Sequence, residues 1–446
     1  MNKLVFLLIL ISNSVFAQDT YTINGHFPNF PKSSFELKGY EGFQEMVLLK
    51  TNSDSEGRFT LTYPADYVGF AQLDMNGAYS NLLFLNKENY SLFWEDLTKR
   101  EDLQVSGSQE YDAFVKGMKT FQKAEAKLAG WHYLLPLYEK DSLKQYQITS
   151  ELDIVNNLFP NYVKSLPEDV WVRQYLLTKG LIEQMPMSVK TYSWRAPQHV
   201  TEFMAIDFTA LMHSGLLKQT IEGYTYLVER FPMEEVTPLL KQAIDKVIVG
   251  FKDEPSIQQE VAQHWFTFLE RHSLFGAAEY LALKMLNDES CILDEKSTNL
   301  FEQYRKMANG KIAPNIDLDV EGSPVTDLKS IDAQYKLVVF GASWCPTCNE
   351  EYSKLKEKYA SLKANKDVEI IYIAIDTDTD AFEAYYGDAP FITFCDGKGW
   401  GTQAALDYYV SATPTYFLLD ATNKILLKPN SVDHANTWMK SRGVVN

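Results

Sequence analysis

The sequence has few cysteines, no long apolar run and no excess of basic residues, and each absence excludes a class of protein. Four cysteines in 446 residues are too few for a disulfide-built scaffold. No stretch approaches the ~20 apolar residues that a membrane-spanning helix needs. The 42 Lys and Arg against 59 Asp and Glu give a net charge of −17, which disfavours phosphate backbones and anionic lipid. We therefore expect a soluble protein with no nucleic-acid partner.

The remaining composition is that of an ordinary folded chain. Hydrophobic residues make up 46% and charged residues 23%, which excludes wholesale disorder, a collagen-like chain and a coiled coil. The length is roughly three times the ~150 residues typical of one domain, so we expect two or three domains.

Residues 1–17 have the pattern of a secretory signal peptide. Lys3 precedes the apolar run Leu4 to Ile11, and Val15-Phe16-Ala17 forms a small-residue cleavage site. No cysteine lies near that site to carry a lipid. We expect cleavage before Gln18 and a periplasmic or secreted protein; the alternative is an uncleaved N-terminal anchor.

Residues 18–108 show short alternating apolar and polar runs separated by turn signals. Examples are Ser34 to Leu37 and Arg58 to Tyr63, and Asn76-Gly77 is one of the turns. About seven or eight strands at this spacing predict an all-β sandwich-like domain or a small barrel.

Residues 109–308 change to a helical period. Apolar residues recur at i, i+3, i+4 and i+7 in residues 111–128, 170–185, 200–217, 236–251 and 258–285. No repeat of fixed length is visible, so a helical solenoid stays open as an arrangement of this α-helical region.

Residues 309–446 alternate strand and helix patterns after the loop-like stretch Asn309 to Asn315. The expected strands are residues 337–340, 368–375, 415–419 and 424–427, and the expected helices are 346–363, 380–386 and 434–440. This pattern predicts a compact α/β domain.

Cys345 and Cys348 form a C-x-x-C at the junction of the first of these strands and the following helix. A helix N-terminus favours the thiolate, and Cys348 lies one turn further on the same side. Attack by Cys345 on a foreign disulfide followed by attack by Cys348 would complete an exchange. We therefore predict a redox-active pair, with Pro346 and Thr347 between the two thiols.

Two other readings of the pair are a zinc site and a buried structural disulfide. Zinc needs two more ligands at matching spacing, and none is present. The strand-to-helix setting beside Trp344 favours an exposed, reactive first thiol.

The remaining motifs predict no cofactor and no metal. Asp376 to Asp380 begins like a calcium loop, but Ala381 and Gly387 occupy positions that require Gly and Glu. The closely spaced glycines at 397, 399 and 401 suit a loop. Cys291 and Cys395 could pair, although two free buried thiols are the default.

Three motifs in order resemble the thioredoxin-like domain of the TlpA/ResA/CcmG (DsbE) family of thiol:disulfide oxidoreductases. They are Ala313 to Leu318, Val338 to Cys348 (VVFGASWCPTC) and Ala412 to Asp420 (ATPTYFLLD). The resemblance covers about residues 312–446. A β-rich segment and a helical region before such a domain also resemble an architecture of secreted proteins from Gram-negative bacteria.

The resemblance implies roles for particular residues. Pro414 would be a cis-proline facing the cysteines, and the Thr413 backbone would pair with substrate. Trp344 and Pro346 would complete the substrate-binding surface. Glu351 would correspond to the family's acid near the cysteine pair; from the residues alone, it is either a proton acceptor for Cys348 or a solvated helix acid. Tyr352 departs from the family, which has a proline soon after this acid.

These observations predict a periplasmic thiol:disulfide oxidoreductase. The family implies reduction of protein disulfides, and a reductant in an oxidising compartment needs a membrane-bound electron donor. The alternatives are an oxidase or isomerase on the same fold, and a non-enzymatic envelope binding protein with a thioredoxin-like scaffold.

Overall fold

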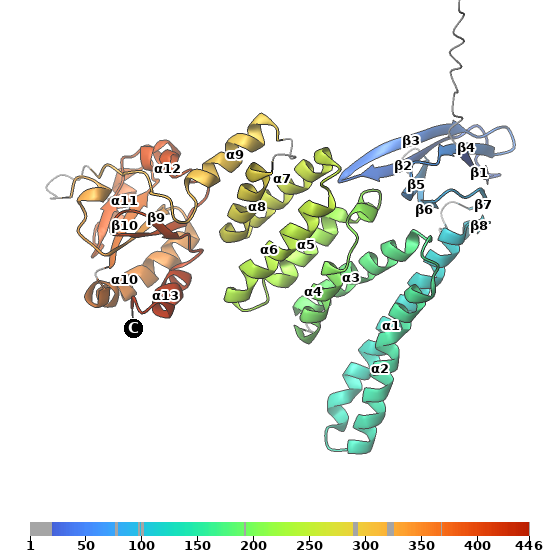
Figure 1. The fold of residues 1–446 in the computed structure, drawn as a ribbon, viewed down its shortest axis with the longest axis horizontal. Helices are drawn as coiled ribbons and strands as arrows, with labels where there is room; N and C mark the ends of the chain where they lie inside the picture. Colours follow the sequence, from blue (N-terminus) through green and yellow to red (C-terminus); the bar gives the residue numbers. More distant parts are fainter. Residues whose placement is uncertain are drawn as a thin grey trace, which may run out of the picture. The chain divides into compact units, whose positions relative to one another are not determined.

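The computed structural model describes residues 20–75, 79–96, 99, 102–190, 193–288, 293–318, 325–366 and 368–445. The signal segment expected at 1–17 lies outside them. The chain divides into two compact units, Met1–Arg230 and Phe231–Asn446. Figure 1 shows the order of the elements within each unit.

The first unit begins with two four-stranded sheets that share one core. Their orders are β4-β1-β7-β8 and β3-β2-β5-β6. Buried residues from both sheets, among them Ile23, Leu37, Leu61 and Leu73, meet in that core. The predicted sandwich is therefore present. The strands are β1 (Thr20–His26), β2 (Ser34–Glu41), β3 (Gln44–Asn52), β4 (Arg58–Pro64), β5 (Gly69–Met75), β6 (Tyr79–Leu85), β7 (Tyr90–Phe93) and β8 (Gln104–Ser106).

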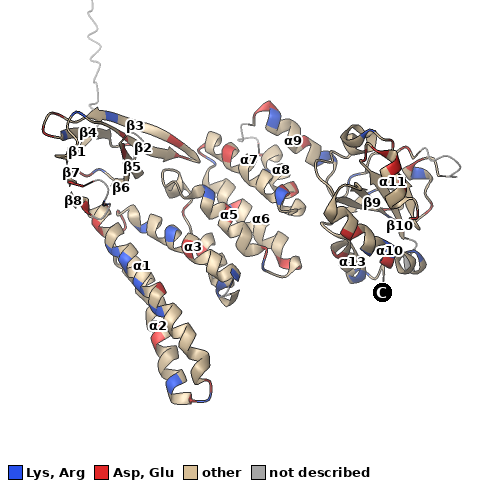
Figure 2. Ribbon diagram, turned by 180° about the vertical axis from the view of Figure 1, so that it is seen from behind, with Lys and Arg blue, Asp and Glu red and all other residues tan. Residues whose placement is uncertain are grey.

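Helices complete the first unit. They are α1 (Gln109–Leu134), α2 (Ser142–Ser165), α3 (Val172–Lys190), α4 (Ala196–Met204) and α5 (Leu217–Val228). Figure 2 shows a run of basic positions along α1, on a chain that is acidic overall. The single helix predicted over residues 200–217 is wrong, because α4 ends at Met204. Asp207 then accepts a hydrogen bond from the Thr209 backbone N–H at 3.1 Å, and Gly215 adopts φ +68°, so the backbone turns before α5 begins.

The second unit begins with four helices, α6 (Met233–Gly250), α7 (Pro255–Arg271), α8 (Phe275–Asn287) and α9 (Glu295–Lys306). The continuous helix predicted over 258–285 is wrong. Ser273 has φ +56°, and the Leu274 N–H returns to the Leu269 carbonyl oxygen at 2.9 Å, so α7 ends there. The resulting turn brings the end of α7 and the start of α8 to one place.

A five-stranded sheet of order β11-β10-β9-β12-β13 forms the centre of the rest of the second unit. β9, β10 and β11 are parallel, whereas β12 runs antiparallel to β9. The strands are β9 (Tyr335–Gly341), β10 (Val368–Ala374), β11 (Ile392–Phe394), β12 (Thr415–Asp420) and β13 (Ile425–Leu427). The four predicted strands are thus present, with bounds shifted by a few residues, and β11 is added.

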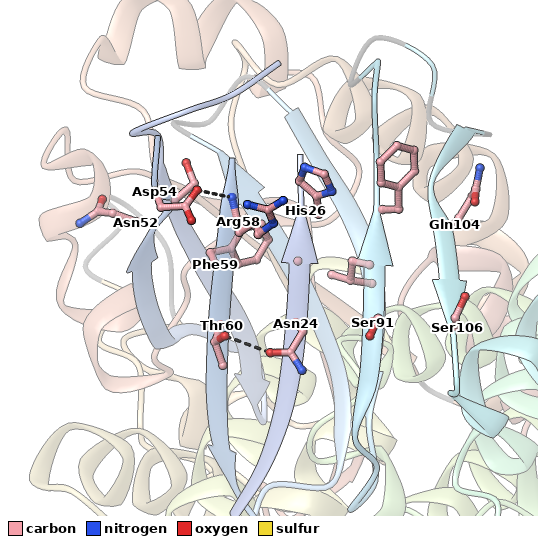
Figure 3. Close-up of a pocket in the computed structure, with 14 residues that line it drawn as sticks. Asn24, His26, Asn52, Asp54, Arg58, Phe59, Thr60, Ser91, Gln104 and Ser106 are labelled. Atoms are coloured by element: carbon pink, nitrogen blue, oxygen red, sulfur yellow. Dashed lines mark hydrogen bonds between the residues drawn. The ribbon is translucent and has the colours of Figure 1, made fainter. Parts of the chain in front are cut away.

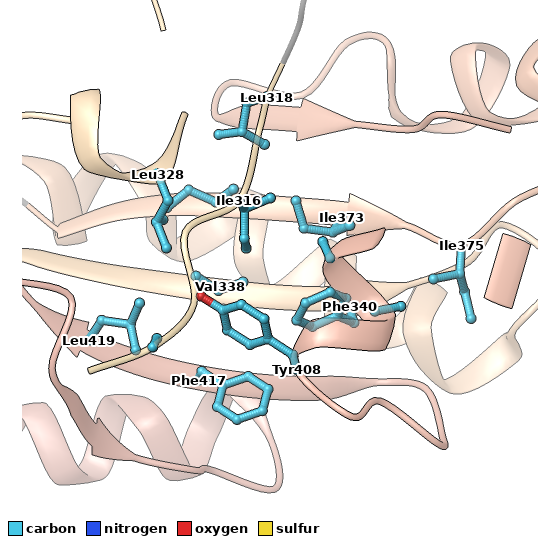
Figure 4. Packing of buried hydrophobic residues seen from close by; sticks show 14 of the residues in the cluster. Ile316, Leu318, Leu328, Val338, Phe340, Ile373, Ile375, Tyr408, Phe417 and Leu419 are labelled. Carbon is cyan, nitrogen blue, oxygen red and sulfur yellow. The ribbon is translucent and has the colours of Figure 1, made fainter. Parts of the chain in front are cut away.

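Apolar side chains cover both faces of this sheet. One face packs against α10 (Pro346–Lys366), α11 (Thr379–Tyr386) and α13 (Val432–Ser441). The other packs against residues within 307–318 and 328–333 and against α12 (Gln403–Asp407). Figure 4 shows this second core, with Ile316 and Leu328 lying over Val338 and Phe340 of β9.

The stretch after α9 joins the helices to the edge of the sheet. The Gly310 N–H donates to the Ile425 carbonyl oxygen at 2.7 Å, and the Ile425 N–H donates to the Lys311 carbonyl oxygen at 2.8 Å. Lys428, just beyond β13, forms an ion pair of 2.9 Å with Glu279 of α8. These contacts fix α8 and α9 against the sheet within the second unit.

Candidate active site

Cys345 and Cys348 lie where β9 gives way to α10, as the sequence predicts. They form a disulfide across a Cα–Cα distance of 5.2 Å. Pro346 is the first residue of α10, a position where its missing N–H removes no helical hydrogen bond. Cys345 is 7% exposed and Cys348 is 1% exposed. An incoming thiol or disulfide therefore meets Cys345 first.

Backbone groups surround the Cys345 sulfur. The Cys348 N–H points at the Cys345 Sγ from 3.2 Å, one of the free donors of the first helical turn. Such donors, together with the helix dipole, stabilise a thiolate at this position. The environment suits a nucleophilic Cys345 in the reduced protein.

The loop before β12 forms the opposite side of the site. Its Thr413–Pro414 peptide bond is cis, as the family resemblance implies. The Thr413 carbonyl oxygen lies 3.7 Å from the Cys345 Sγ, although 68 residues separate them in sequence. The structure thus brings Thr413 and Pro414 together with the cysteine pair.

Trp344, the residue before Cys345, lies near a second exposed tryptophan, Trp400. Trp344 is 57% exposed and Trp400 is 45% exposed, and their ring centroids are 6.4 Å apart. Trp400 belongs to the short 3₁₀ turn Gly399–Gly401, which the sequence identified only as a loop. Its signal was an aromatic residue between closely spaced glycines. Aromatic side chains exposed beside a reactive group commonly contact partners.

A buried carboxylate supports the loop that precedes Cys345. Asp376, at the end of β10 and 1% exposed, accepts hydrogen bonds from the Ser343 N–H at 3.1 Å and from its Oγ at 2.5 Å. The Asn349 side chain donates to the Ser343 carbonyl oxygen at 2.9 Å. Sequence reasoning considered Asp376 only as part of a failed calcium loop. The signal it missed was an acid at the end of the strand next to β9.

A tyrosine pair extends this network under α10. The Tyr386 hydroxyl donates to Asn349 Oδ1 at 3.2 Å and receives the Tyr372 hydroxyl at 3.0 Å. Burial raises the pKa of both phenols, so each remains a neutral donor near neutral pH. A Cβ at Gly341 would collide with the Tyr372 hydroxyl, which explains why glycine ends β9.

Glu351 is buried, and the hydrogen bonds of its carboxylate are to residues of α10, β12 and α13. It accepts hydrogen bonds from the Tyr416 hydroxyl at 3.1 Å, the Val432 N–H at 2.7 Å and Lys354 Nζ at 2.7 Å. The carboxylate therefore joins α10 to β12 and to the start of α13. It is 7% exposed, which differs from a solvated helix acid.

Cys395 is a free, half-buried thiol whose Sγ lies 3.6 Å from the Asp376 carbonyl oxygen. Burial raises the pKa of this thiol, so it is a weaker nucleophile than an exposed cysteine. The expectation of two free thiols holds for Cys395, whereas Cys291 lies outside the described residues and that part of the expectation stays a prediction. Among the described residues, no group of three or more His, Cys, Asp or Glu side chains is arranged to hold a metal ion. No helix in the described ranges is both long and apolar enough to cross a membrane.

The first unit carries a separate, open and polar hollow on its β4-β1-β7-β8 sheet. Figure 3 shows Asn24 and His26 of β1 beside Arg58 and Thr60 of β4, with Gln104 on β8. Thr60 donates to Asn24 at 2.9 Å. The side chains are those expected on the solvated face of a sandwich.

The part of the chain that carries the cysteine pair is similar to known proteins. The model of a family described as thioredoxin-like matches residues 333–425. The thiol-disulfide oxidoreductase ResA of Bacillus cereus is 32% identical over 131 residues, which is 29% of this chain and 73% of ResA. Mouse nucleoredoxin is 25% identical over 136 residues, and the match spans only 30% of nucleoredoxin.

Solved structures are also similar to part of the chain. A thiol-disulfide oxidoreductase from Bacteroides fragilis is 28% identical and covers 30% of this chain and 99% of its own, with a TM-score of 0.27. A thioredoxin-like protein from Bacteroides caccae covers 51% of this chain and 83% of its own at 17% identity, with a TM-score of 0.39.

Proposed function

We propose that this chain, which belongs to the thioredoxin-like family of ResA-type thiol-disulfide oxidoreductases, reduces disulfide bonds of proteins in the bacterial cell envelope. The observation that carries the proposal is the Cys345–Cys348 disulfide at the start of α10, with the Thr413 carbonyl oxygen 3.7 Å from the Cys345 Sγ. This arrangement presents one sulfur to a partner and holds the second one turn behind it.

The proposed cycle starts from the reduced protein. The Cys345 thiolate attacks one sulfur of the substrate disulfide, forms a mixed disulfide and releases the other substrate sulfur as a thiolate, which takes a proton from water. The Cys348 thiol then loses its proton to a base, and its thiolate attacks the Cys345 sulfur. The mixed disulfide breaks, and the second substrate sulfur leaves as a thiolate that takes a proton from water. Two electrons pass to the substrate, and the Cys345–Cys348 disulfide seen here is the oxidised product.

The other site residues have supporting roles in this proposal. Trp344, Pro346, Thr413 and Pro414 form the surface that receives the substrate around Cys345. Glu351, one turn beyond Cys348, accepts the proton of the resolving thiol. Its test is Glu351→Gln, which should change the pH dependence of thiol alkylation; an unchanged profile would leave Glu351 as a residue that only positions α13.

The proposed direction of the reaction, reduction, follows from the family. The proposed location, the periplasm, follows from the expected N-terminal signal. A cleaved segment 1–17 would deliver the protein to the periplasm, and a membrane-bound donor would return electrons to the Cys345–Cys348 disulfide. Residues 18–108 and 109–308 would act as a docking or oligomerisation platform that restricts which protein disulfides reach Cys345 of the thioredoxin-like domain at 309–446. An oxidase, an isomerase or a binding protein on this fold remains the alternative, and the reduction potential separates these classes.

The deciding experiment measures insulin reduction together with a redox titration of the full chain. Cys345→Ser should abolish reduction, and Cys348→Ser should accumulate mixed disulfides with substrates. Titration against glutathione should give a potential low enough to reduce protein disulfides. Full activity of Cys345→Ser would refute the enzyme, whereas a strongly oxidising potential would support the oxidase.

A further inference from the structure

A cavity in the second unit begins at the redox site and ends against the helices. Its volume is about 530 Å³. Thr347, Thr413 and Pro414 line it on the side of the disulfide, and the ends of α7 and α9 line it on the other side. Volumes of this order hold a small ligand or a few side chains. The helical wall is therefore part of the surface that a partner of Cys345 meets.

The helical wall is a connected polar network. The Tyr304 hydroxyl of α9 donates to Glu270 Oε1 of α7. Lys428 Nζ lies 4.9 Å from the centroid of the Tyr304 ring and forms the ion pair with Glu279. The side chains of Lys428 and Glu279 are only 11% and 13% exposed. Groups held in this way keep a fixed geometry, as a binding site requires.

Three charged residues line the cavity: Glu270, Arg271 and Lys428. Lys428 is paired with Glu279, and Arg271 is exposed to solvent, where its field is screened. Glu270 is the only carboxylate among the described residues that line the cavity, and it is only partly exposed. Among the described residues Glu270 forms no ion pair, so it is the lining group left to pair with a cationic ligand.

We propose that this cavity is the specificity pocket of the full-length chain, which receives the segment flanking a substrate cysteine and uses Glu270 to select a lysine or arginine in that segment. The inference rests on the proposed function, because the pocket matters only if Cys345 exchanges disulfides with a polypeptide. It assigns to α7 and α9 a role in substrate choice that the cysteine pair and the cis-proline loop do not supply.

The state of Glu270 agrees with a site that awaits a cation. Burial raises its pKa to about 7, although nearby Lys428 acts in the opposite direction. A carboxylate that is costly to ionise in the empty cavity gains most when a cationic partner enters. The net charge of −17 further favours the approach of basic segments.

The test uses short synthetic peptides, each with one cysteine and linked as a symmetric disulfide. The residues flanking the cysteine are Lys, Gln or Glu in three otherwise identical peptides. The fully reduced full-length protein is mixed with each peptide, and the rate of its oxidation is followed by acid quench and thiol alkylation. We expect the Lys peptide to react about tenfold faster than the Glu peptide, with the Gln peptide between them.

Glu270→Gln removes the negative charge and should bring the three rates to within about twofold of one another. Thr267→Arg is the second variant, because Thr267 is an exposed residue of α7 that lines the same cavity and Arg is a good helix former. It should also abolish the preference for Lys. Glu350→Gln is the matched control, an exposed acid of α10 that is not among the residues lining the cavity, and it should keep the preference.

Equal rates in the unmodified protein, faster reaction of the Glu peptide, or a preference for Lys that survives both cavity variants would overturn the proposal. Loss of the preference in Glu350→Gln would also overturn it, since the selection would then come from overall charge. Circular dichroism checks that Glu270→Gln is folded, and Thr267→Arg decides the question if it is not. A reduced protein that fails to react even with hydroxyethyl disulfide would refute the proposed function itself, whereas reaction without selection would refute only the pocket.

Discussion

The two sheet systems of this chain bury their strands in different ways. Strand β4 of the first unit alternates exposed and buried residues, so one of its faces meets solvent. Strand β10 of the second unit is buried at all seven positions, because helices or loops cover both faces of its sheet. A strand with one solvent-exposed face can carry polar side chains along its whole length, as Figure 3 shows for β1 and β4. A strand covered on both faces can present chemistry only at its ends.

The redox site lies at the ends of strands, as expected for a sheet that is covered on both faces. Cys345 comes just after the end of β9, and Asp376 comes just after the end of the neighbouring β10. The strands are parallel, so these ends lie at the same edge of the sheet. The difference between the sheets therefore explains why the candidate site lies at a strand edge in the second unit.

The largest effect we expect tests this difference through stability. Ile371→Ala, in β10 and fully buried, should lower the free energy of unfolding by ~3 kcal/mol, because it leaves a cavity in a packed core. Thr62→Ala, on the exposed face of β4, should change it by less than ~0.5 kcal/mol. Urea denaturation measures both. Similar losses for the two variants would show that the burial difference does not control stability.

A smaller effect is expected at the edge of the sheet that carries the site. Asp376→Asn weakens the charge-assisted hydrogen bonds to Ser343, so we expect a loss of ~1–2 kcal/mol in stability and about fivefold slower disulfide exchange. Asp380→Asn, an exposed acid of α11, is the control for charge alone. Equal rates for the two variants would mean that the Ser343 loop does not depend on Asp376.

The smallest effect concerns Glu270 and pH. The folded protein holds the Glu270 proton up to a pKa of about 7, whereas an ordinary glutamate has a value of 4.5. The folded state therefore binds more protons than the unfolded state between these values, and its stability falls as pH rises through this window and levels off above it. Because Glu270 is partly exposed to solvent, the change in unfolding free energy should be small. The unfolding free energy of the wild type is compared with that of Glu270→Gln, which does not titrate. The value for the wild type minus the value for the variant should decrease from pH 4.5 to 7, and a constant difference would contradict the raised pKa.

Local patterns predicted much of the architecture. Alternation predicted the sandwich, and apolar runs predicted the strands at the centre of the second sheet. Prediction failed where a helix ends although the apolar period of the sequence continues. The apolar period continues through Ser273, but the left-handed backbone there separates α7 from α8. Helix α9 has only Ser297 and Phe301 buried, which leaves little periodicity to detect.

By itself, the sequence determined the cysteine pair, its place between a strand and a helix and the motif that contains the cis-proline, because each depends on neighbours along the chain. Only the tertiary structure decided which distant groups surround that pair. It placed Thr413 against Cys345, Asp376 and Asn349 beneath Ser343, and Glu351 against the start of α13. It also placed α7 and α9 beside the cis-proline loop. Such contacts arise when separate elements bury their apolar faces together, and no local spacing records which elements will meet.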